Sequence, residues 1–394
     1  MIGIDTGNTA WILIAAAMVF FMTPGLALFY GGMARSKNVL STIMQSFFLI
    51  GVISVEFMLI GYTLIFGDDV HGIIGSLNKI GLMGTENSIM EGANIPEMAF
   101  IAFQCMFAII TPAIMSGSIT GRMRFAPFVV FAVIWSVLIY NPMAHWVWGG
   151  GFLANLGALD FAGGLVIHVL SGVSGLVLCL LLGRRRGYGR MPMLPHHLPM
   201  TVLGGAMLWF GWFGFNAGSA LGAGTLAANA VLTTQMSAAI GIVGWVLVER
   251  YHRGKPTVLG AVSGGVSGLV AITPAAGFVT PVAAIPIGFI GAICCYVAVA
   301  ILKSKFGYDD SLDAFGIHGV GGMWGAIATG LFATVSVNPD GADGLFYGGN
   351  LLIPQLISLV VAIALAIIGT VVIFKVVSYF MDMRVSISAE SLGI

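Results

Sequence analysis

The sequence predicts an all-α membrane protein: eleven transmembrane helices, with an inverted pair of five-helix pseudo-repeats followed by an eleventh helix. Three observations predict this fold, namely the composition, eleven apolar segments of spanning length, and matches between the two halves. Of 394 residues, 58% are hydrophobic and only 8% are charged, whereas a soluble domain carries about 25% charged residues. The formal net charge is zero, so no basic surface for nucleic acid is expected.

Eleven segments are long and apolar enough to cross a bilayer, which takes about 20 residues in a helix. The predicted spans are 9–31, 40–66, 97–119, 125–143, 162–183, 198–217, 228–249, 258–276, 281–301, 313–335 and 351–381. The first apolar run exceeds the roughly 7–15 residues of a signal-peptide core, so we expect it to be the first helix. We therefore expect one membrane domain over 1–394, with a short tail at 382–394.

The basic residues predict how the chain is oriented in the membrane. If every predicted span crosses, nearly all Lys and Arg residues fall on one side; Lys79 alone lies in a connection on the other side, and Lys375 lies within the last span. Cytoplasmic loops carry an excess of Lys and Arg. We therefore expect the N-terminus outside and the C-terminus in the cytoplasm, which agrees with an odd number of spans.

Short sequence matches, each displaced by five predicted spans, relate the two halves of the chain. The matches are Ala17–Phe21 with Ala206–Phe210, Ile110–Ala113 with Ile272–Ala275, and Leu159–Asp160 with Leu312–Asp313. Because five is odd, the second half must enter the membrane in the opposite direction. Inverted repeats are typical of transporters, with the path at the repeat interface. We expect pseudo-repeats over about 9–183 and 198–335, with the helix at 351–381 outside them.

Two histidines lie within the fifth and tenth predicted spans, in the shared pattern H-x-x-[SG]-G-x-x-G. His168 is seven residues from the outer end of its span and His318 is five residues from the inner end, which places them about 10 Å and 8 Å deep. Ionisable residues at this depth mark substrate or proton pathways. A single buried histidine is more simply explained as a core residue bonded to a carbonyl. The symmetric pair favours a function, and we expect the two rings to meet near the midplane.

Aromatic residues cluster near the predicted outer ends of the third, fourth and sixth spans. They are Phe103, Phe107, Trp148, Trp212 and Phe215. Aromatic faces can hold a small cation through the ring quadrupole. An interfacial aromatic belt is an equally good explanation from the spacing alone, so both interpretations stay open.

Two carboxylates need an explanation at membrane depth. Asp160 begins the fifth span, where it can cap the helix or contact a cation; we favour the cap. Glu56 lies within the second span and must be protonated or paired, but the sequence identifies no partner. The four cysteines lie in apolar runs without the spacing of a metal site, so neither a disulfide framework nor a metal or other cofactor is expected.

Several motifs together resemble those of the Amt/Mep/Rh family of ammonium transporters, in its prokaryotic Amt branch. They extend from the first predicted span to the tenth. The motifs are Pro24-Gly-Leu-Ala-Leu-Phe29-Tyr30-Gly-Gly, Phe103-Gln104-x-x-Phe107-Ala, Ala144-His-x-x-Trp148-Gly-Gly-Gly, Gly157-Ala-Leu-Asp160-Phe-Ala-Gly-Gly, Trp209-Phe-Gly-Trp212-Phe-Gly-Phe215-Asn and Phe315-Gly-Ile-His318-Gly.

The resemblance implies roles for particular residues and an assembly. It places an outer ammonium site at Phe107, Trp148 and Ser219 with Phe103 beside them, a gate at Phe107 and Phe215, a pore and proton relay at His168, His318 and Trp212, and a structural or electrostatic role at Asp160. It also implies a homotrimer with one pore per subunit and PII-type, GlnK-like regulators on the cytoplasmic face.

This chain departs from the family pattern at two places outside the implied pore. Gly121 stands before Arg122, where the family often has Glu, and the tail 382–394 is shorter than is usual in the family. These differences affect cytoplasmic contacts and regulation by the tail.

The function that the resemblance implies is ammonium transport across the cell membrane. Burying an isolated ion costs tens of kcal/mol, whereas a cation–π contact returns only about 0.5–2 kcal/mol. The cation must lose its proton before it crosses, and we favour electrogenic transport in which the proton follows through the histidines. A passive NH3 or CO2 channel and an ammonium sensor are the alternatives. An enzyme is not expected, since the pair His196–His197 lacks further ligands for a catalytic or metal site.

Overall fold

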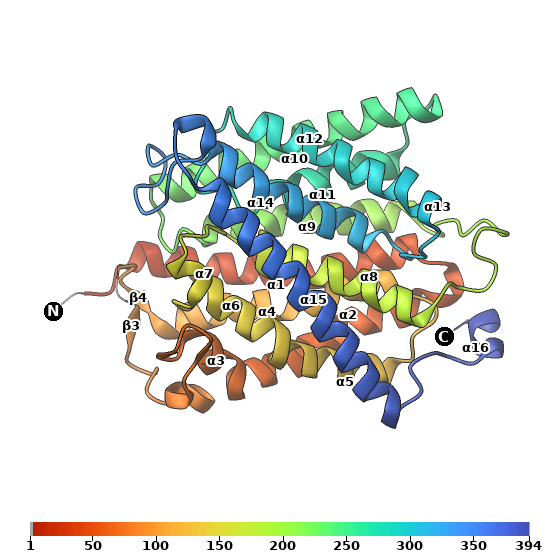
Figure 1. Ribbon diagram of the computed structural model, residues 1–394, viewed down its shortest axis with the longest axis horizontal. Coiled ribbons are helices and arrows are strands. Elements are labelled where there is room, and N and C mark those ends of the chain that lie inside the picture. Colours follow the sequence, from red (N-terminus) through yellow and green to blue (C-terminus); the bar gives the residue numbers. More distant parts are fainter. Residues whose placement is uncertain (1–2, 91, 394) are drawn as a thin grey trace.

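The computed structural model describes residues 3–90 and 92–393 and is a bundle of long helices that run broadly along one axis (Figure 1). The N-terminus lies at one end of the bundle, beside the short strands β3 (Ile89–Met90) and β4 (Ile95–Pro96). The C-terminus lies at the opposite end, beside α16 (Ile387–Leu392). We call these two ends the N-terminal face and the C-terminal face.

Within the described ranges, nine helices are long and apolar enough to cross a membrane. They are Thr6–Met33, Ser36–Phe66, Glu97–Ile119, Phe125–Asn155, Gly164–Leu182, Leu198–Gly218, Thr225–Arg253, Ala284–Phe306 and Leu352–Phe380. Each coincides with a predicted span to within a few residues at most ends. The prediction of an all-helical, multi-pass membrane protein is therefore confirmed.

Two further predicted spans form shorter helical segments. The first, α11 (Val258–Ile272), has 15 residues, and the second consists of η7 (Phe315–Gly319) followed by α14 (Val320–Phe332). The total of eleven spans stays a prediction.

Several spans are built from successive segments. The uninterrupted helices are α1 (Thr6–Met33), α4 (Glu97–Ile119), α9 (Leu198–Gly218), α10 (Thr225–Arg253) and α15 (Leu352–Phe380). The composite ones are η1 (Ser36–Asn38), α2 (Val39–Glu56), η2 (Phe57–Gly61) and α3 (Tyr62–Phe66); α5 (Phe125–Trp135), η4 (Ser136–Tyr140), α6 (Asn141–Trp148) and α7 (Phe152–Asn155); η5 (Gly164–Val169) and α8 (Leu170–Leu182); and α12 (Ala284–Val297), η6 (Ala298–Leu302) and α13 (Lys303–Phe306).

The connections at the N-terminal face contain the remaining short elements. Strand β1 (Asp69–Val70) pairs antiparallel with β2 (Ile74–Gly75), and β3 pairs antiparallel with β4. The 3₁₀ segments are η3 (Leu77–Leu82) and η8 (Leu345–Tyr347). The strands and η3 pack around the ends of α3, α4 and α6, whereas η8 packs against α14.

Wide π-helical turns lie within three composite spans, at η2, η4 and η6, and they form the first turns of two further helices, at η5 and η7. Such turns occur often at functional sites, because the extra residue rotates the following side chains and frees backbone groups. His168 lies in η5 and His318 lies in η7. Both histidines therefore project from locally widened helices.

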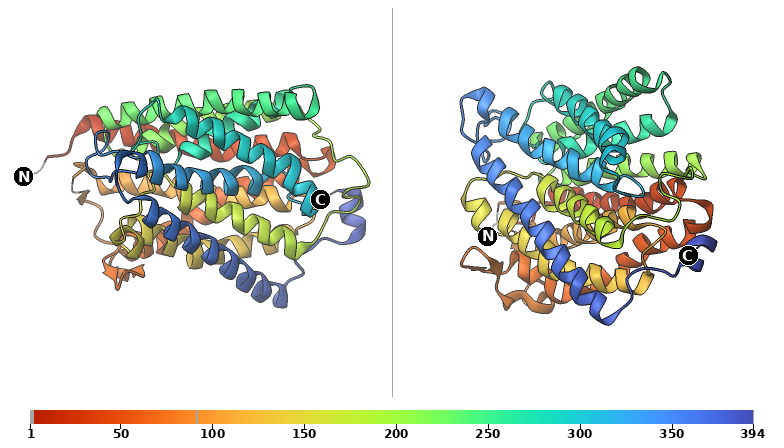
Figure 2. Two further views of the ribbon diagram at one scale, coloured as in Figure 1. Left: turned by 45° about the horizontal axis from the view of Figure 1, so that its top comes forward. Right: turned by 45° about the vertical axis from the view of Figure 1, so that its right-hand side comes forward.

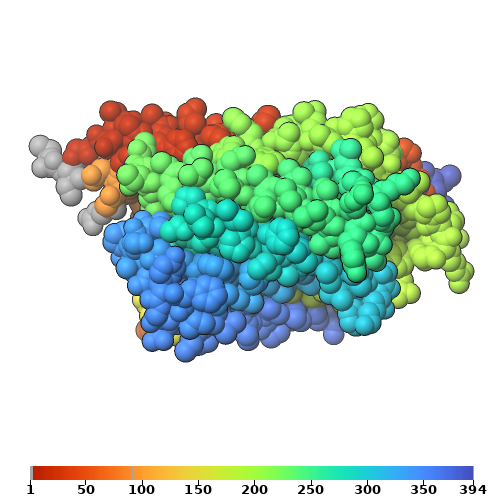
Figure 3. Space-filling model, turned by 90° about the horizontal axis from the view of Figure 1, so that it is seen from above, coloured from red at the N-terminus to blue at the C-terminus, as the bar shows by residue number. Residues whose placement is uncertain are grey.

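Glycine lets α1 and α9 pack backbone to backbone, side by side along most of their length (Figure 2). A Cβ atom on Gly204 would lie 2.2 Å from the backbone nitrogen of Phe29, and one on Gly25 would lie 2.9 Å from Cβ of Met207. In a membrane, small residues at helix interfaces allow this approach. The helices α10 and α12 pack closely in the same way and form one continuous surface in the space-filling view (Figure 3).

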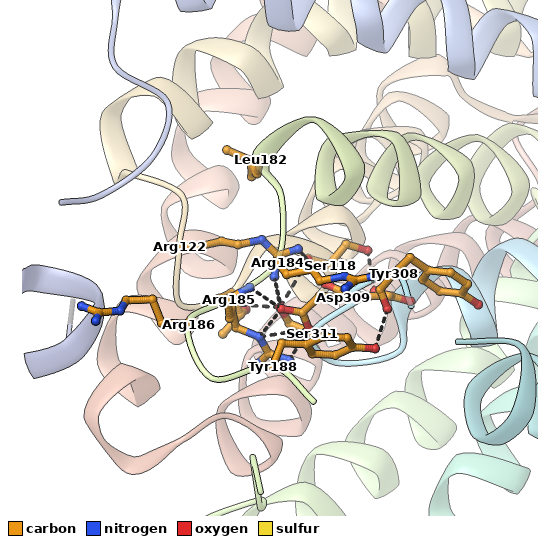
Figure 4. A network of polar contacts seen from close by, with 12 residues as sticks. Ser118, Arg122, Leu182, Arg184, Arg185, Arg186, Tyr188, Tyr308, Asp309 and Ser311 are labelled. Atoms are coloured by element: carbon orange, nitrogen blue, oxygen red, sulfur yellow. Dashed lines mark hydrogen bonds and ion pairs between the residues drawn. The ribbon is translucent and has the colours of Figure 1, made fainter. Parts of the chain in front are cut away.

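A buried ion network joins three connections at the C-terminal face (Figure 4). The Asp309 carboxylate accepts from Nη2 of Arg185 at 2.6 Å and from Nη1 of Arg122 at 3.1 Å. Burial alone raises the pKa of Asp309, but the hydrogen bonds and charge of Arg185, together with the charge of Arg122, outweigh it and lower the pKa. The carboxylate is therefore held ionised between two guanidinium groups.

The short C-terminal tail docks onto the same face. Oε1 of Glu390 accepts from the backbone nitrogen of Arg186 at 2.6 Å, and Oε2 accepts from Nη2 of Arg384 at 2.9 Å. Nη1 of Arg384 donates to the carbonyl of Leu182 at 2.6 Å. The tail is thus tied to the connection that follows α8.

Replacing the shared carboxylate of the C-terminal face should destabilise the fold. Asp309→Ala leaves Arg122 and Arg185 buried without their counter-ion, which costs about 3–5 kcal/mol. Asp382→Ala removes a carboxylate that is 80% exposed and pairs with Arg124, and it should cost at most about 1 kcal/mol. Thermal unfolding in detergent should show a large fall in Tm for the first variant only. Equal melting temperatures would contradict this account.

Candidate functional site

The two buried histidines meet at the centre of the molecule. Nδ1 of His318 lies 3.2 Å from Nδ1 of His168, and the ring centroids are 5.2 Å apart with the planes 25° from parallel. A neutral imidazole carries one N–H donor and one acceptor nitrogen, so one ring donates to the other. The predicted meeting of the two rings is confirmed.

Glycines in the shared histidine pattern make this meeting possible. A Cβ atom on Gly172, four residues after His168, would lie 2.3 Å from the backbone nitrogen of Gly319. A Cβ atom on Gly322, four residues after His318, would lie 2.8 Å from the carbonyl oxygen of Gly164 and 3.1 Å from Cβ of His168. Each glycine therefore clears space for the other histidine helix, which explains why the pattern combines histidine with glycine.

A column of rings leads from the histidines toward the N-terminal face. Phe215 lies 5.9 Å from His168, and it stacks on Phe107 with centroids 4.4 Å apart and planes 6° from parallel. Trp212 stacks on His168 at 5.3 Å and donates its Nε1 hydrogen to Oγ1 of Thr273 at 2.9 Å. All of these rings are buried, so the column excludes bulk water.

An aromatic pocket of about 360 Å³ lies at the far end of this column. Its lining residues are Phe66, Met90, Phe100, Gln104, Phe107, Val147, Trp148, Phe161, Ser219 and Leu221. Trp148 stands edge-on to Phe107, with centroids 6.1 Å apart and planes at 84°. The Ser219 hydroxyl donates to the carbonyl of Phe215 at 2.9 Å, so its oxygen lone pairs stay free to accept. Rings and a hydroxyl acceptor together suit a small cation with N–H donors.

Phe103 does not line the aromatic pocket. It is fully buried and packs against Phe107, with ring centroids 4.8 Å apart. Its position supports the ring that faces the pocket.

The Asp160 side chain caps the start of η5. Its carboxylate accepts from the backbone nitrogens of Gly163, Gly164, Leu165 and Val166 at 2.6–3.1 Å. Its own carbonyl accepts from Nε1 of Trp148 at 2.8 Å. Asp160 therefore joins the start of the His168 helix to a wall of the aromatic pocket, and it is not among the residues that line the pocket.

Asp310 holds the corresponding place before η7. Its Oδ2 accepts from the backbone nitrogens of Phe315 and Gly316 at 2.9 and 3.4 Å, and its Oδ1 accepts from Oγ of Ser118 at 2.8 Å. The carboxylate precedes its histidine by eight residues, as Asp160 precedes His168. The Leu-Asp match to Asp313 is therefore not the structural counterpart, and the spacing from the histidine was the signal that identifies Asp310.

Glu56 has partners that sequence spacing could not supply. Its Oε2 accepts from Oγ of Ser136 at 3.1 Å, and its Oε1 accepts from Nδ2 of Asn141 at 2.9 Å. Glu56 directly precedes η2, while Ser136 begins η4 and Asn141 follows it. The two widened helices meet at this polar contact, away from the ring column.

Comparisons with known proteins agree with this geometry. A family profile described as "Ammonium Transporter Family" matches residues 10–394. The chain is 54% identical to an ammonium transporter of Bacillus subtilis over 390 residues, which cover 98% of this chain and 96% of that protein. The crystal structure of Saccharomyces cerevisiae Mep2 is 36% identical, with a TM-score of 0.92 over 98% of this chain and 88% of that chain. A structure described as "Sensor Amt Protein" is 28% identical, with a TM-score of 0.91 over 98% and 96%.

This chain belongs to the ammonium transporter family. It is a multi-pass membrane protein that transports ammonium, and it is not an enzyme. Three features follow one another through the molecule: the histidine pair, the stacked phenylalanines and the aromatic pocket.

Filling the space between the histidine helices should separate the two rings. In Gly172→Ala the added methyl meets the backbone of Gly319, and the resulting shift should cost about 1–3 kcal/mol and reduce ammonium transport strongly. Gly51→Ala is the matched control, since a Cβ at Gly51 meets no atom within 4 Å. Ammonium uptake into proteoliposomes measures both variants. Full transport by Gly172→Ala would show that the close approach is not required.

Proposed function

We propose that the transporter recruits the ammonium cation in the aromatic pocket, removes its proton, conducts NH3 past the phenylalanine pair, and passes the proton through the two histidines. The transport is then electrogenic. The observation that carries this proposal is the Nδ1–Nδ1 contact of His168 and His318, together with the buried Nε2 of His168, which has no hydrogen-bond partner among the residues that the structure describes.

Recruitment rests on the faces of Phe107 and Trp148 and on the hydroxyl of Ser219. The planes of Phe107 and Trp148 are almost perpendicular. A cation in the angle between them contacts both aromatic side chains at once. Each such contact contributes about 0.5–2 kcal/mol. An N–H of the cation donates to the Ser219 oxygen, which adds one directed hydrogen bond to the aromatic contacts.

Deprotonation follows from the electrostatic cost of the ring column. An isolated cation in a medium of low dielectric costs tens of kcal/mol, far more than the aromatic contacts return. Loss of one proton converts the cation to neutral ammonia, whose passage between Phe107 and Phe215 requires only that the stacked rings move apart. The gate therefore admits the neutral molecule and excludes the ion.

The histidine pair offers a route for the released proton. A transient chain of water between the parted rings carries the proton from the pocket to Nε2 of His168. The Nδ1 proton of His168 then moves to Nδ1 of His318, and His318 releases its Nε2 proton toward the C-terminal face. One positive charge thus crosses with each ammonia molecule. Afterwards both rings hold the opposite tautomers and the hydrogen bond between them is reversed, so the tautomers must return before the next proton can pass.

The same proposal includes the topology and the assembly. We propose eleven spans, with pseudo-repeats over about 9–183 and 198–335. Because the basic connections belong in the cytoplasm, the N-terminal face with its aromatic pocket lies outside the cell and the C-terminal face lies in the cytoplasm. The structurally matched pairs Asp160–His168 and Asp310–His318 support the repeat. The family resemblance supports a homotrimer and a PII-type, GlnK-like regulator at the C-terminal face.

A passive NH3 channel is the main competing mechanism, because neutral ammonia could pass the same rings without the proton. A cation pocket at the entrance favours recruitment of the ion over gas conduction. Ammonium sensing is a second candidate, supported by the likeness to the structure described as "Sensor Amt Protein". Saturable ammonium flux in the absence of any partner distinguishes a transporter from a protein that only senses.

Removing an imidazole should abolish the ammonium current. In His168→Ala the acceptor at Nε2 and the contact with His318 are both lost, so the proton has no route. Solid-supported-membrane electrophysiology on proteoliposomes should show no ammonium current in this variant, while its melting temperature stays close to that of the wild type. An unchanged current would remove the imidazole from the mechanism. Wild-type ammonia flux without any current would support the passive channel.

Removing the indole should weaken ammonium binding more than turnover. Trp148→Leu keeps an apolar side chain but loses the ring that stands edge-on to Phe107. A lost cation–π contact of about 0.5–2 kcal/mol corresponds to a KM about two- to thirty-fold higher. The dependence of current on ammonium concentration measures this change. An unaltered KM would place recruitment outside the aromatic pocket.

A further inference from the structure

His145 lies one turn before Trp148 on α6, and its side chain is completely buried. Its Nδ1 is 2.7 Å from the carbonyl oxygen of Ile65, and its Nε2 is 2.9 Å from Oδ1 of Asp69. A carbonyl and an ionised carboxylate can only accept hydrogen bonds. Both ring nitrogens must therefore donate, which requires the doubly protonated, positively charged imidazolium form.

The partner carboxylate is suited to hold this charge. Hydrogen bonding with His145 lowers the pKa of Asp69 more than its slight burial raises it, and the backbone N–H of Gly72 and the nearby ring of His71 lower it further. The backbone nitrogen of Gly72 lies 2.9 and 3.0 Å from the two carboxylate oxygens. The Asp69 side chain is 39% exposed at the N-terminal face, so the pair joins a buried cation to a partly exposed anion.

The His145 contacts tie together two walls of the aromatic pocket. Ile65 directly precedes Phe66, and Trp148 follows His145 by three residues; Phe66 and Trp148 both line the pocket. The carbonyl of His145 accepts from the backbone nitrogens of Gly149 and Gly151 at 2.9 and 3.0 Å. The backbone of His145 therefore accepts the hydrogen bonds that close the turn directly after Trp148, at the end of α6.

The turn is also packed against the His145–Ile65 contact. A Cβ atom on Gly149 would lie 2.0 Å from the carbonyl oxygen of Ile65 and 2.5 Å from Nδ1 of His145. No side chain fits there, so the backbone directly after Trp148 packs against the imidazole ring and the Ile65 carbonyl. His145 itself is not one of the residues that line the aromatic pocket.

We infer that His145, as an imidazolium held between Ile65 and Asp69, is a positioning residue that fixes Trp148 relative to Phe66 and thereby sets the affinity of the aromatic pocket for ammonium. The inference rests on the proposed recruitment of ammonium in that pocket. His145 does not touch the cation. It acts by holding one wall of the pocket in place.

Asp69→Asn tests this role, because the amide keeps the size of the side chain but removes the counter-charge of the imidazolium. The KM for the ammonium current should rise about threefold or more while Vmax changes less than about twofold, as expected when binding rather than turnover is lost. Asp68→Asn is the matched control. It removes the same charge from the adjacent residue, whose backbone nitrogen donates to Oδ1 of Asn78 and whose carbonyl accepts from the backbone nitrogen of Ser76.

A spectroscopic measurement tests the charge state independently of transport. In ¹⁵N solid-state NMR of histidine-labelled wild-type protein at neutral pH, one histidine should show two protonated ring nitrogens, and that signal should disappear in His145→Gln. A bare nitrogen on His145 would overturn the inference. So would equal KM values for Asp69→Asn and Asp68→Asn, or a lower Vmax with unchanged KM in Asp69→Asn. Failure of the proposed function would appear instead as the absence of saturable ammonium current in the wild type.

Discussion

The hydrogen bond between His168 and His318 is the contact on which the rest of the pathway depends. Two side chains from helices of opposite halves reach 3.2 Å at Nδ1 only because Gly172 and Gly322 remove the side chains that would keep those helices apart. Both histidines lie in π-helical turns, which are frequent at functional sites. Asp160 and Asp310 then fix the starts of both turns through backbone N–H groups.

The electrostatics of the pathway divide it into two environments. The aromatic pocket offers ring faces and a hydroxyl acceptor, and a cation can be held there at little cost. Beyond the stacked Phe107 and Phe215 the surroundings are buried rings, where an ion loses its hydration without receiving an equivalent replacement. The neutral imidazoles can hydrogen-bond ammonia in this region. In the proposed mechanism, the cation therefore loses its proton because of the change from one environment to the next, and no single residue is responsible for the loss.

Much of this arrangement could be predicted from sequence because it depends on local composition. Segment hydropathy located the spanning helices, and two ionisable residues in repeated apolar contexts indicated that His168 and His318 would meet. The stacking of Phe107 on Phe215 came only from the family resemblance. Hydropathy carries no information about π-helical turns, since these depend on the packing of neighbouring helices. The partners of Glu56 were not predictable, because Ser136 and Asn141 lie 80 and 85 residues away on a different span. His145 was missed for the same reason: its role depends on Ile65 and Asp69, which only the fold brings to it.

The central claim is that the transported cation loses its proton before it passes the phenylalanine pair, and ion selectivity tests it most directly. Potassium is close to ammonium in size and charge but has no proton to lose. Solid-supported-membrane electrophysiology of wild-type proteoliposomes, with equal gradients of ammonium and potassium, should record a current for ammonium and none for potassium. A potassium current of comparable size would show that an intact cation crosses the ring column, and it would contradict the account.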